Sequence, residues 1–171
     1  RGFADLIDAY NSQRVGAGTV ALGLAQGAFE KAMAFVKERK QFGRPIAEFQ
    51  GLQWMLADMA VALNAARLSL HQAGLSADPF PDPLLAAQAK IIASETANTV
   101  TNQALQLFGA RGYSRDYPLE RMVRDARMFT IAGGTAQVLR TLVASRILDT
   151  KLPQTRNGYL EAVQAPSLAA K

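Results

Sequence analysis

The sequence has no cysteine and only one histidine, His71, among its 171 residues. Without cysteine there is no disulfide, no thiol nucleophile and no thiolate metal ligand. A single histidine does not make the multi-histidine cluster of a typical zinc site. We therefore expect no metal centre.

Long apolar runs are also absent. No stretch approaches the roughly 18 apolar residues that a membrane-spanning helix needs, and no charged segment followed by an apolar core marks a signal peptide. We therefore expect a cytoplasmic protein without membrane partners. The chain begins with Arg1 and a helical pattern starts almost at once, so we expect a piece of a longer polypeptide.

Basic residues exceed acidic ones, which gives a formal net charge of +5. Such a charge favours an anionic partner, such as nucleic acid, a membrane surface or a phosphorylated small molecule. The basic residues are spread along the chain instead of forming one tract, which disfavours nucleic acid as the partner.

The apolar residues recur with the 3.6-residue period of helices, and no useful stretch alternates as strands do. Glycine and proline in "KQFGRPIAEF" and the proline-rich "SADPFPDP" separate the first helices. Three long and two shorter helices are predicted: 3–36, 49–75, 83–108, 119–131 and 135–148.

The expected fold class is all-α, an antiparallel up-and-down helical bundle, because short loops let each apolar stripe face one core. We assign residues 1–150 to this bundle. Residues 151–171 are interrupted by proline and lack an apolar stripe, so we expect a tail that is extended or only partly ordered.

One polar cluster interrupts the first predicted helix, and a second cluster lies at its end. Asn11 and Arg14, with Gln13 between them, lie three residues apart and so share a helix face; they favour a ligand with phosphate or carbonyl oxygens, or else form a solvated stripe. Arg39 and Phe42 combine a cation with an aromatic ring, a pair suited to a phosphate beside a flat heterocycle. Arg39 alone would also suit a helix C-terminus.

Two turns contain paired glycines. In "QLFGARGY", Gly109 and Gly112 either end the third predicted helix or bring bare backbone close to a ligand. In "TIAGGTAQVLR", Gly133 and Gly134 precede Thr135, which predicts an N-cap and a helix N-terminus open to an anion or a carbonyl oxygen.

These segments together resemble a known family. "QRVGAGTVALGLAQGAFEKAM", "ERKQFGRPIAEFQGLQWMLADM", "AAQAKIIASETAN", "ALQLFGARGYSRDYPLERMVRDARM" and "IAGGTAQVLR" are similar to the C-terminal helical domain of acyl-CoA dehydrogenases, over about residues 11–148. The resemblance implies a flavoprotein with FAD as cofactor and an acyl-CoA as substrate. It also implies N-terminal domains outside this chain and a homo-oligomer, a dimer or a tetramer.

The resemblance assigns residues to each ligand. Those implied to contact an FAD held by the neighbouring subunit are Arg39, Gln41, Phe42, Ile46, Gln50, Gln106, Leu107, Phe108, Gly109 and Ala110. Thr135 and Gln137 are implied to contact the FAD of their own subunit. The residues at acyl-CoA positions are Asn11, Gln13, Arg14 and Gly134.

Both positions at which the family keeps its catalytic base are altered. Most members have a glutamate immediately before the Gly-Thr pair, where this sequence has Gly133; a minority have it before the arginine that is Arg14 here, where this sequence has Gln13. Loss of a positioned base costs on the order of 10²–10⁴-fold in rate. We therefore assign no catalytic residue and expect changed chemistry.

Gln13, "AGGTAQ" and "LPQTRNGY" resemble the 3-sulfinopropionyl-CoA desulfinases, family members without the glutamate. The implied reaction releases sulfite and gives succinyl-CoA, and sulfinate leaves without removal of an α-proton by a glutamate. Two alternatives stay open: an α,β-dehydrogenase whose base lies elsewhere, and a non-catalytic flavin scaffold or nucleic-acid binder. The segment alone is expected to be inactive.

Overall fold

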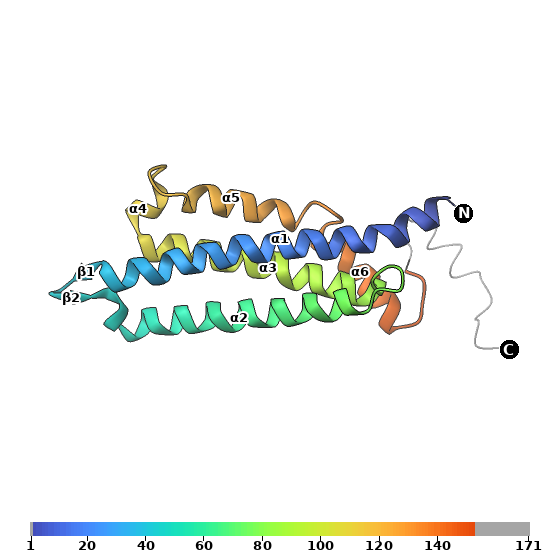
Figure 1. Ribbon diagram of the computed structural model, residues 1–171, viewed down its shortest axis with the longest axis horizontal. Helices are drawn as coiled ribbons and strands as arrows, with labels where there is room; N and C mark the ends of the chain where they lie inside the picture. The colour runs from blue at the N-terminus through green and yellow to red at the C-terminus, as the bar shows by residue number, and fades with distance from the viewer. Residues whose placement is uncertain (1, 153–171) are drawn as a thin grey trace.

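The computed structural model describes residues 2–152 (Figure 1). Its elements are α1 (Gly2–Glu38), β1 (Lys40–Gln41), β2 (Arg44–Pro45), the 3-10 helix η1 (Ile46–Glu48), α2 (Gln50–Leu75), α3 (Pro83–Phe108), α4 (Ala110–Tyr113), α5 (Leu119–Phe129) and α6 (Ala136–Ile147). The long helices α1, α2 and α3 run side by side in alternating directions, α5 lies along α1 and α3, and α6 lies at the end near the N-terminus (Figure 1). The predicted all-α bundle is confirmed.

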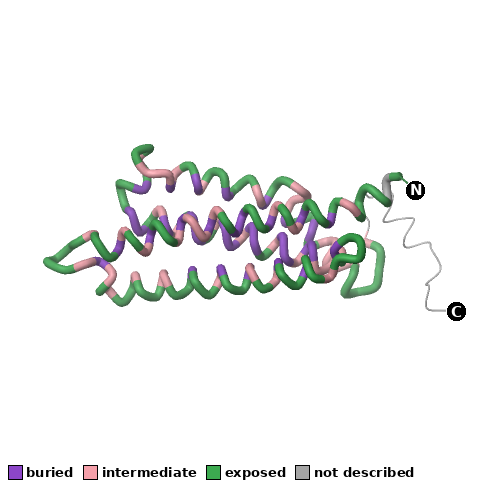
Figure 2. Tube along the Cα trace, in the orientation of Figure 1, coloured by how far each residue is buried: buried purple, intermediate pink, exposed green. Residues whose placement is uncertain are grey.

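Helix α3 is the centre of the bundle, because it packs against α1, α2, α5 and α6. Small side chains dominate its contact with α1. The core alanines of these two helices are Ala21, Ala25, Ala28, Ala32, Ala89, Ala93, Ala97 and Ala104. Side chains of this size let two helix axes approach closely, and the inward faces of the helices are accordingly buried (Figure 2).

The helix ends follow local sequence signals. Asp82 caps α3 by accepting a hydrogen bond on its side chain from the Leu85 backbone N–H at 2.9 Å, and Pro83 occupies the first turn. Both features are typical of helix starts, since proline has no N–H to leave unpaired there. Thr135 caps α6 in the same way, with the Val138 N–H 3.2 Å from its Oγ1. The predicted N-cap at Thr135 is therefore present.

A short antiparallel hairpin connects α1 to α2, where the sequence pattern predicts only a turn. Lys40 pairs with Pro45 and Gln41 with Arg44. Phe42 and Gly43 at its tip both have positive φ, 51° and 78°, which is the geometry of a tight two-residue hairpin turn. Strands of two residues are too short to show alternation, so periodicity does not reveal them.

The single-turn helix α4 was also not predicted. It follows Gly109, whose φ is 59° at the end of α3. Gly112 is buried against α3, and a Cβ there would lie 2.5 Å from the Leu105 carbonyl oxygen. The close backbone approach at Gly112 is therefore made to α3 itself and serves packing.

None of the described helices has the length and hydropathy needed to cross a bilayer. The predicted tail lies almost wholly outside the described residues, which end at 152. The division between bundle and tail stays a prediction.

Truncating a core side chain of α2 should destabilise the bundle. Leu63 is 2% exposed, so Leu63→Ala should lower the free energy of unfolding by about 2–5 kcal/mol, through lost burial and an incompletely filled cavity. Val61 is 70% exposed, so Val61→Ala should change it by less than about 0.5 kcal/mol. Urea denaturation followed by circular dichroism compares the two, and equal losses would contradict the assigned inward face.

Candidate functional site

The turn between α5 and α6 lies against both α1 and α3. Gly133 and Gly134 have φ of 75° and 94°, a left-handed conformation that glycine adopts without steric cost. Lys90 of α3 donates a hydrogen bond from Nζ to the Gly134 carbonyl oxygen at 2.8 Å. A Cβ at Gly133 would lie 3.2 Å from Gln13 Oε1 and 3.9 Å from Lys90 Cε. Three distant segments therefore meet here.

We call this group the glycine-turn site. It comprises Asn11, Gln13, Arg14, Lys90, Gly133 and Gly134. All of the residues that the sequence places at acyl-CoA positions are members. Gln13 and Gly133, the two positions at which the sequence resemblance places the family's base, lie side by side although 120 residues separate them, and neither bears a carboxylate.

Asn11 and Arg14 are buried, with 1% and 8% of their surface exposed. Arg14 donates from one terminal nitrogen to Asn11 Oδ1 at 2.7 Å, and its buried Nε has no hydrogen-bond partner among the described residues. A solvated stripe is thus ruled out for this pair. Gln13, between them in sequence, is exposed, so it is the accessible side chain of the three.

The electrostatics of the site are dominated by two buried cations. Lys90 is 0% exposed; burial lowers its pKa, and the positive charge of Arg14 lowers it further. Burial also lowers the pKa of Arg14, against an opposing effect of Tyr10. The ion pairs within residues 2–152 are Glu120–Arg124 and Glu95–Arg140. Neither Lys90 nor Arg14 has an acidic partner there, so the site favours an anion or a carbonyl oxygen.

Sequence reasoning missed Lys90. A signal was present, because in "AAQAKIIASETA" this lysine lies four residues after Ala86 and three before Ala93. That spacing places it on the same face of α3 as the buried alanines. A lysine on an apolar stripe is rarely fully buried without a specific role.

A second site lies at the hairpin end of the bundle. A pocket of about 670 Å³ is lined by Arg39, which follows α1, and Arg111 of α4, together with Phe35, Phe108 and Tyr117. Phe35 and Phe108 stack with ring centroids 4.1 Å apart, and Tyr117 meets Phe108 edge-on at 5.4 Å. The pocket combines cations with aromatic rings, as expected for Arg39, but its aromatic walls are not Phe42.

Phe42 instead lies at the hairpin tip and is 90% exposed. It meets Phe49 edge-on with centroids 6.1 Å apart. The other residues assigned to the neighbour's FAD divide by exposure. Gln41, Gln50, Gln106, Gly109 and Ala110 are exposed, and Ile46, Leu107 and Phe108 are buried.

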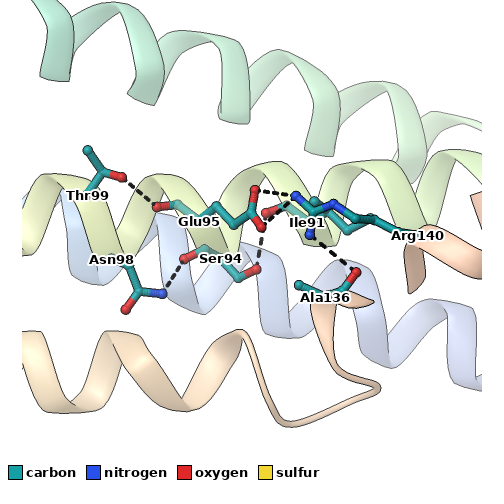
Figure 3. Close-up of polar contacts among 7 residues, drawn as sticks. All are labelled: Ile91, Ser94, Glu95, Asn98, Thr99, Ala136 and Arg140. Atoms are coloured by element: carbon teal, nitrogen blue, oxygen red, sulfur yellow. Dashed lines mark hydrogen bonds and ion pairs between the residues drawn. The ribbon is translucent and has the colours of Figure 1, made fainter. Parts of the chain in front are cut away.

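Thr135 and Gln137 line a third, smaller pocket of about 270 Å³ beside α3, with Glu95 and Arg127 among its walls. Figure 3 shows how α6 is fixed there: Arg140 pairs with Glu95 at 2.7 Å and also donates to the Ala136 carbonyl oxygen at 3.4 Å. Both partners are about half exposed, so the pair contributes little stability. Its effect is to orient the start of α6.

The hairpin-end pocket and the glycine-turn site are far apart. Gln13 lies within α1, and Arg39 directly follows the last residue of that helix, 26 positions further along the chain. At 1.5 Å per helical residue this corresponds to about 39 Å. Figure 1 shows the hairpin and α6 at opposite ends of the bundle. The fold therefore brings together the residues predicted to contact acyl-CoA and places them far from the residues of the hairpin-end pocket.

A family model described as the C-terminal domain of acyl-CoA dehydrogenase matches residues 1–148. The chain belongs to the acyl-CoA dehydrogenase family. Among solved structures it is similar to butyryl-CoA dehydrogenase from Megasphaera elsdenii, with a TM-score of 0.79 and 37% identity over 81% of this chain and 37% of that one.

Two curated relatives are more similar in sequence. The chain is 70% identical to 3-sulfinopropanoyl-CoA desulfinase of Advenella mimigardefordensis, covering 96% of this chain and 41% of that protein. It is 69% identical to the desulfinase of Cupriavidus necator, covering 94% and 40%. The chain thus spans about 40% of the length of these relatives. The predicted resemblance to the desulfinases is confirmed.

Removing the buried cation should change the pH dependence of stability. Because the folded-state pKa of Lys90 lies below its ordinary value of 10.5, the unfolded chain binds more protons between these two values, and the free energy of unfolding rises with pH there. Lys90→Met should remove this contribution. Urea denaturation across that pH window, with the exposed Lys37→Met as control, measures it; an unchanged slope in Lys90→Met would refute the assignment.

Proposed function

We propose that this chain is the C-terminal domain of a cytoplasmic, desulfinase-type flavoenzyme that releases sulfite from 3-sulfinopropanoyl-CoA. The observation that carries the proposal is the pairing of Gln13 with Gly133. The two places where the family keeps a base come together in one site, and both lack a carboxylate. The similarity to two desulfinases supports the same conclusion.

The product expected above, succinyl-CoA, is wrong on carbon count. The 3-sulfinopropanoyl group has three carbons and the succinyl group has four. Breaking the carbon–sulfur bond leaves a three-carbon acyl group, so the product is propanoyl-CoA. One water supplies the hydrogen that the carbon gains and the oxygen that turns sulfinate into sulfite; sulfur is oxidised as carbon is reduced, and no external oxidant is needed.

The glycine-turn site suits this reaction better than dehydrogenation. The Gln13 amide accepts and donates hydrogen bonds but has no useful basicity near neutral pH, so it orients a ligand and does not abstract a proton. Arg14 and Lys90 make the site electropositive. A substrate that already carries an anionic leaving group is complementary to that field.

FAD is the cofactor of this family, and the residues of the hairpin-end pocket fit it. Arg39 and Arg111 offer donors to phosphate oxygens, and Phe35 and Phe108 offer aromatic surface. When bound, the flavin supplies a reversible electron acceptor. Thr135 and Gln137, at the other end of the bundle, are the candidates for FAD contacts within the same subunit.

The distance between these two groups supports a homo-oligomer, a dimer or a tetramer. Arg39 directly precedes β1 and Thr135 caps α6, and these two elements lie at opposite ends of the chain's bundle (Figure 1). The proposal is that each FAD is contacted by the Arg39 group of one copy and the Thr135 group of another. The N-terminal domains of the same polypeptide complete the site.

The full-length enzyme should convert 3-sulfinopropanoyl-CoA to propanoyl-CoA and sulfite, detected by mass spectrometry and a sulfite assay. It should not bleach its flavin when mixed anaerobically with butanoyl-CoA, because neither Gln13 nor Gly133 carries a carboxylate to remove the α-proton. Absence of both products would overturn the proposal. Rapid bleaching would instead indicate a dehydrogenase whose base lies in the N-terminal region.

Restoring a carboxylate should restore α-proton chemistry. Gln13 is the better position, because glutamate at Gly133 would be strained at a φ of 75° and crowded by the Gln13 side chain. Gln13→Glu should raise the rate of flavin bleaching by butanoyl-CoA by about 10²-fold or more. Stopped-flow absorbance measures it, with the exposed neighbour Ser12→Glu as control; an equal effect of both would show that charge alone matters.

A further inference from the structure

Lys90 has a position that the proposed reaction does not explain. It lies on the buried face of α3, none of its surface is exposed, and its ammonium group donates to the Gly134 carbonyl oxygen at 2.8 Å. It therefore ties α3 to the turn that replaces the family's base. A neutral donor would make the same hydrogen bond at a lower desolvation cost.

A second buried cation lies beside it. Arg14 is close enough for its charge to lower the pKa of Lys90, and its buried Nε has no hydrogen-bond partner among the described residues. Two buried like charges without a carboxylate are costly. A bound anion offsets that cost, and the unpartnered Nε provides a donor for one.

We propose that Lys90 is a positioning residue that makes the glycine-turn site selective for acyl groups ending in an anion. The inference rests on the proposed function, which places the acyl group of the thioester at this turn. Lys90 acts through the Gly134 carbonyl and through its charge, not by contact, because it is fully covered. Together with Arg14 it favours a terminal sulfinate over an aliphatic end of similar length.

The arrangement also explains why lysine is used. Its hydrogen bond holds a turn whose two glycines have left-handed φ, and its charge adds to that of Arg14 behind the turn. A neutral acyl chain gains nothing from this field, whereas an anion gains on the order of tenfold in affinity from one partly screened charge. Selectivity among thioesters is therefore the property that isolates the role of Lys90.

The test uses the full-length, FAD-loaded enzyme and two probes, 3-sulfinopropanoyl-CoA and butanoyl-CoA. Lys90→Gln keeps a hydrogen-bond donor but loses the charge, Lys90→Arg keeps the charge, and Lys37→Gln is the control at an exposed lysine. Dissociation constants come from the change in flavin absorbance on binding. Flavin content and circular dichroism report whether each variant folds.

Lys90→Gln should weaken binding of the sulfinate thioester by about tenfold and leave butanoyl-CoA within about twofold, while Lys90→Arg and Lys37→Gln keep the wild-type preference. Equal weakening of both thioesters would show a purely structural role and overturn the inference. So would an unchanged ratio in Lys90→Gln.

If Lys90→Gln does not fold, the pH dependence of thioester binding by the wild-type enzyme still tests the inference. Its preference for the sulfinate thioester should fall as the pH rises and Lys90 loses its proton, since the sulfinate stays ionised. From α1, the charged group that faces Lys90 is Arg14, whose guanidinium lies over the Tyr10 ring. The turn faces Lys90 with a backbone carbonyl. A preference that stays constant as the pH rises to the ordinary lysine pKa of 10.5 would overturn the inference.

Failure of the inference and failure of the proposed function give different results. Sulfite release with an unchanged preference in Lys90→Gln refutes only the role of Lys90. A charge-dependent preference without sulfite release refutes only desulfination.

Discussion

The close approach of α1 and α3 is the constraint on which the rest of the structure depends. Alanines at helical spacing line both helices and are fully buried, so the two backbones lie nearer than larger side chains would permit. At one end this contact brings Arg14 and Gln13 of α1 beside Lys90 of α3. At the other it stacks Phe35 on Phe108 and forms the wall of the hairpin-end pocket. Both candidate sites are therefore consequences of one packed interface.

Burial of charge is the second consequence of that interface. Lys90 is fully buried, so its ammonium group depends on a backbone carbonyl for solvation. That carbonyl belongs to a turn with left-handed glycines, which places the start of α6 and the Thr135 cap. The Glu95–Arg140 pair fixes the same helix from the outside. The buried Lys90 side chain thus holds the turn in place. The desolvation cost of burying its charge falls at the site where a ligand is expected.

Much of this architecture could be predicted from the sequence, because the long helices carry sustained apolar periodicity and clear end signals such as Asp82 and Thr135. The two-residue strands and α4 were missed, since elements of that size leave no period and form through local turn geometry. The sequence predicted only some of the residues of the glycine-turn site, and this too has a physical cause. Gln13 and Gly133 were singled out by family position, whereas their contact depends on how α1 meets the turn. Lys90 was overlooked although its spacing places it on the buried face of α3, because its contact with the Gly134 carbonyl depends on how α3 meets the turn.

The geometry also shows how one fold supports different chemistry. A carboxylate at Gly133 or Gln13 would lie next to Lys90 and Arg14, which would hold it ionised and lower its basicity as well as orient it. Without the carboxylate, the same two cations are left unneutralised by any described residue. No described negative charge balances these cations, so the site favours an anionic ligand. The same two cations that would orient a carboxylate at either position therefore favour an anionic ligand when that carboxylate is absent.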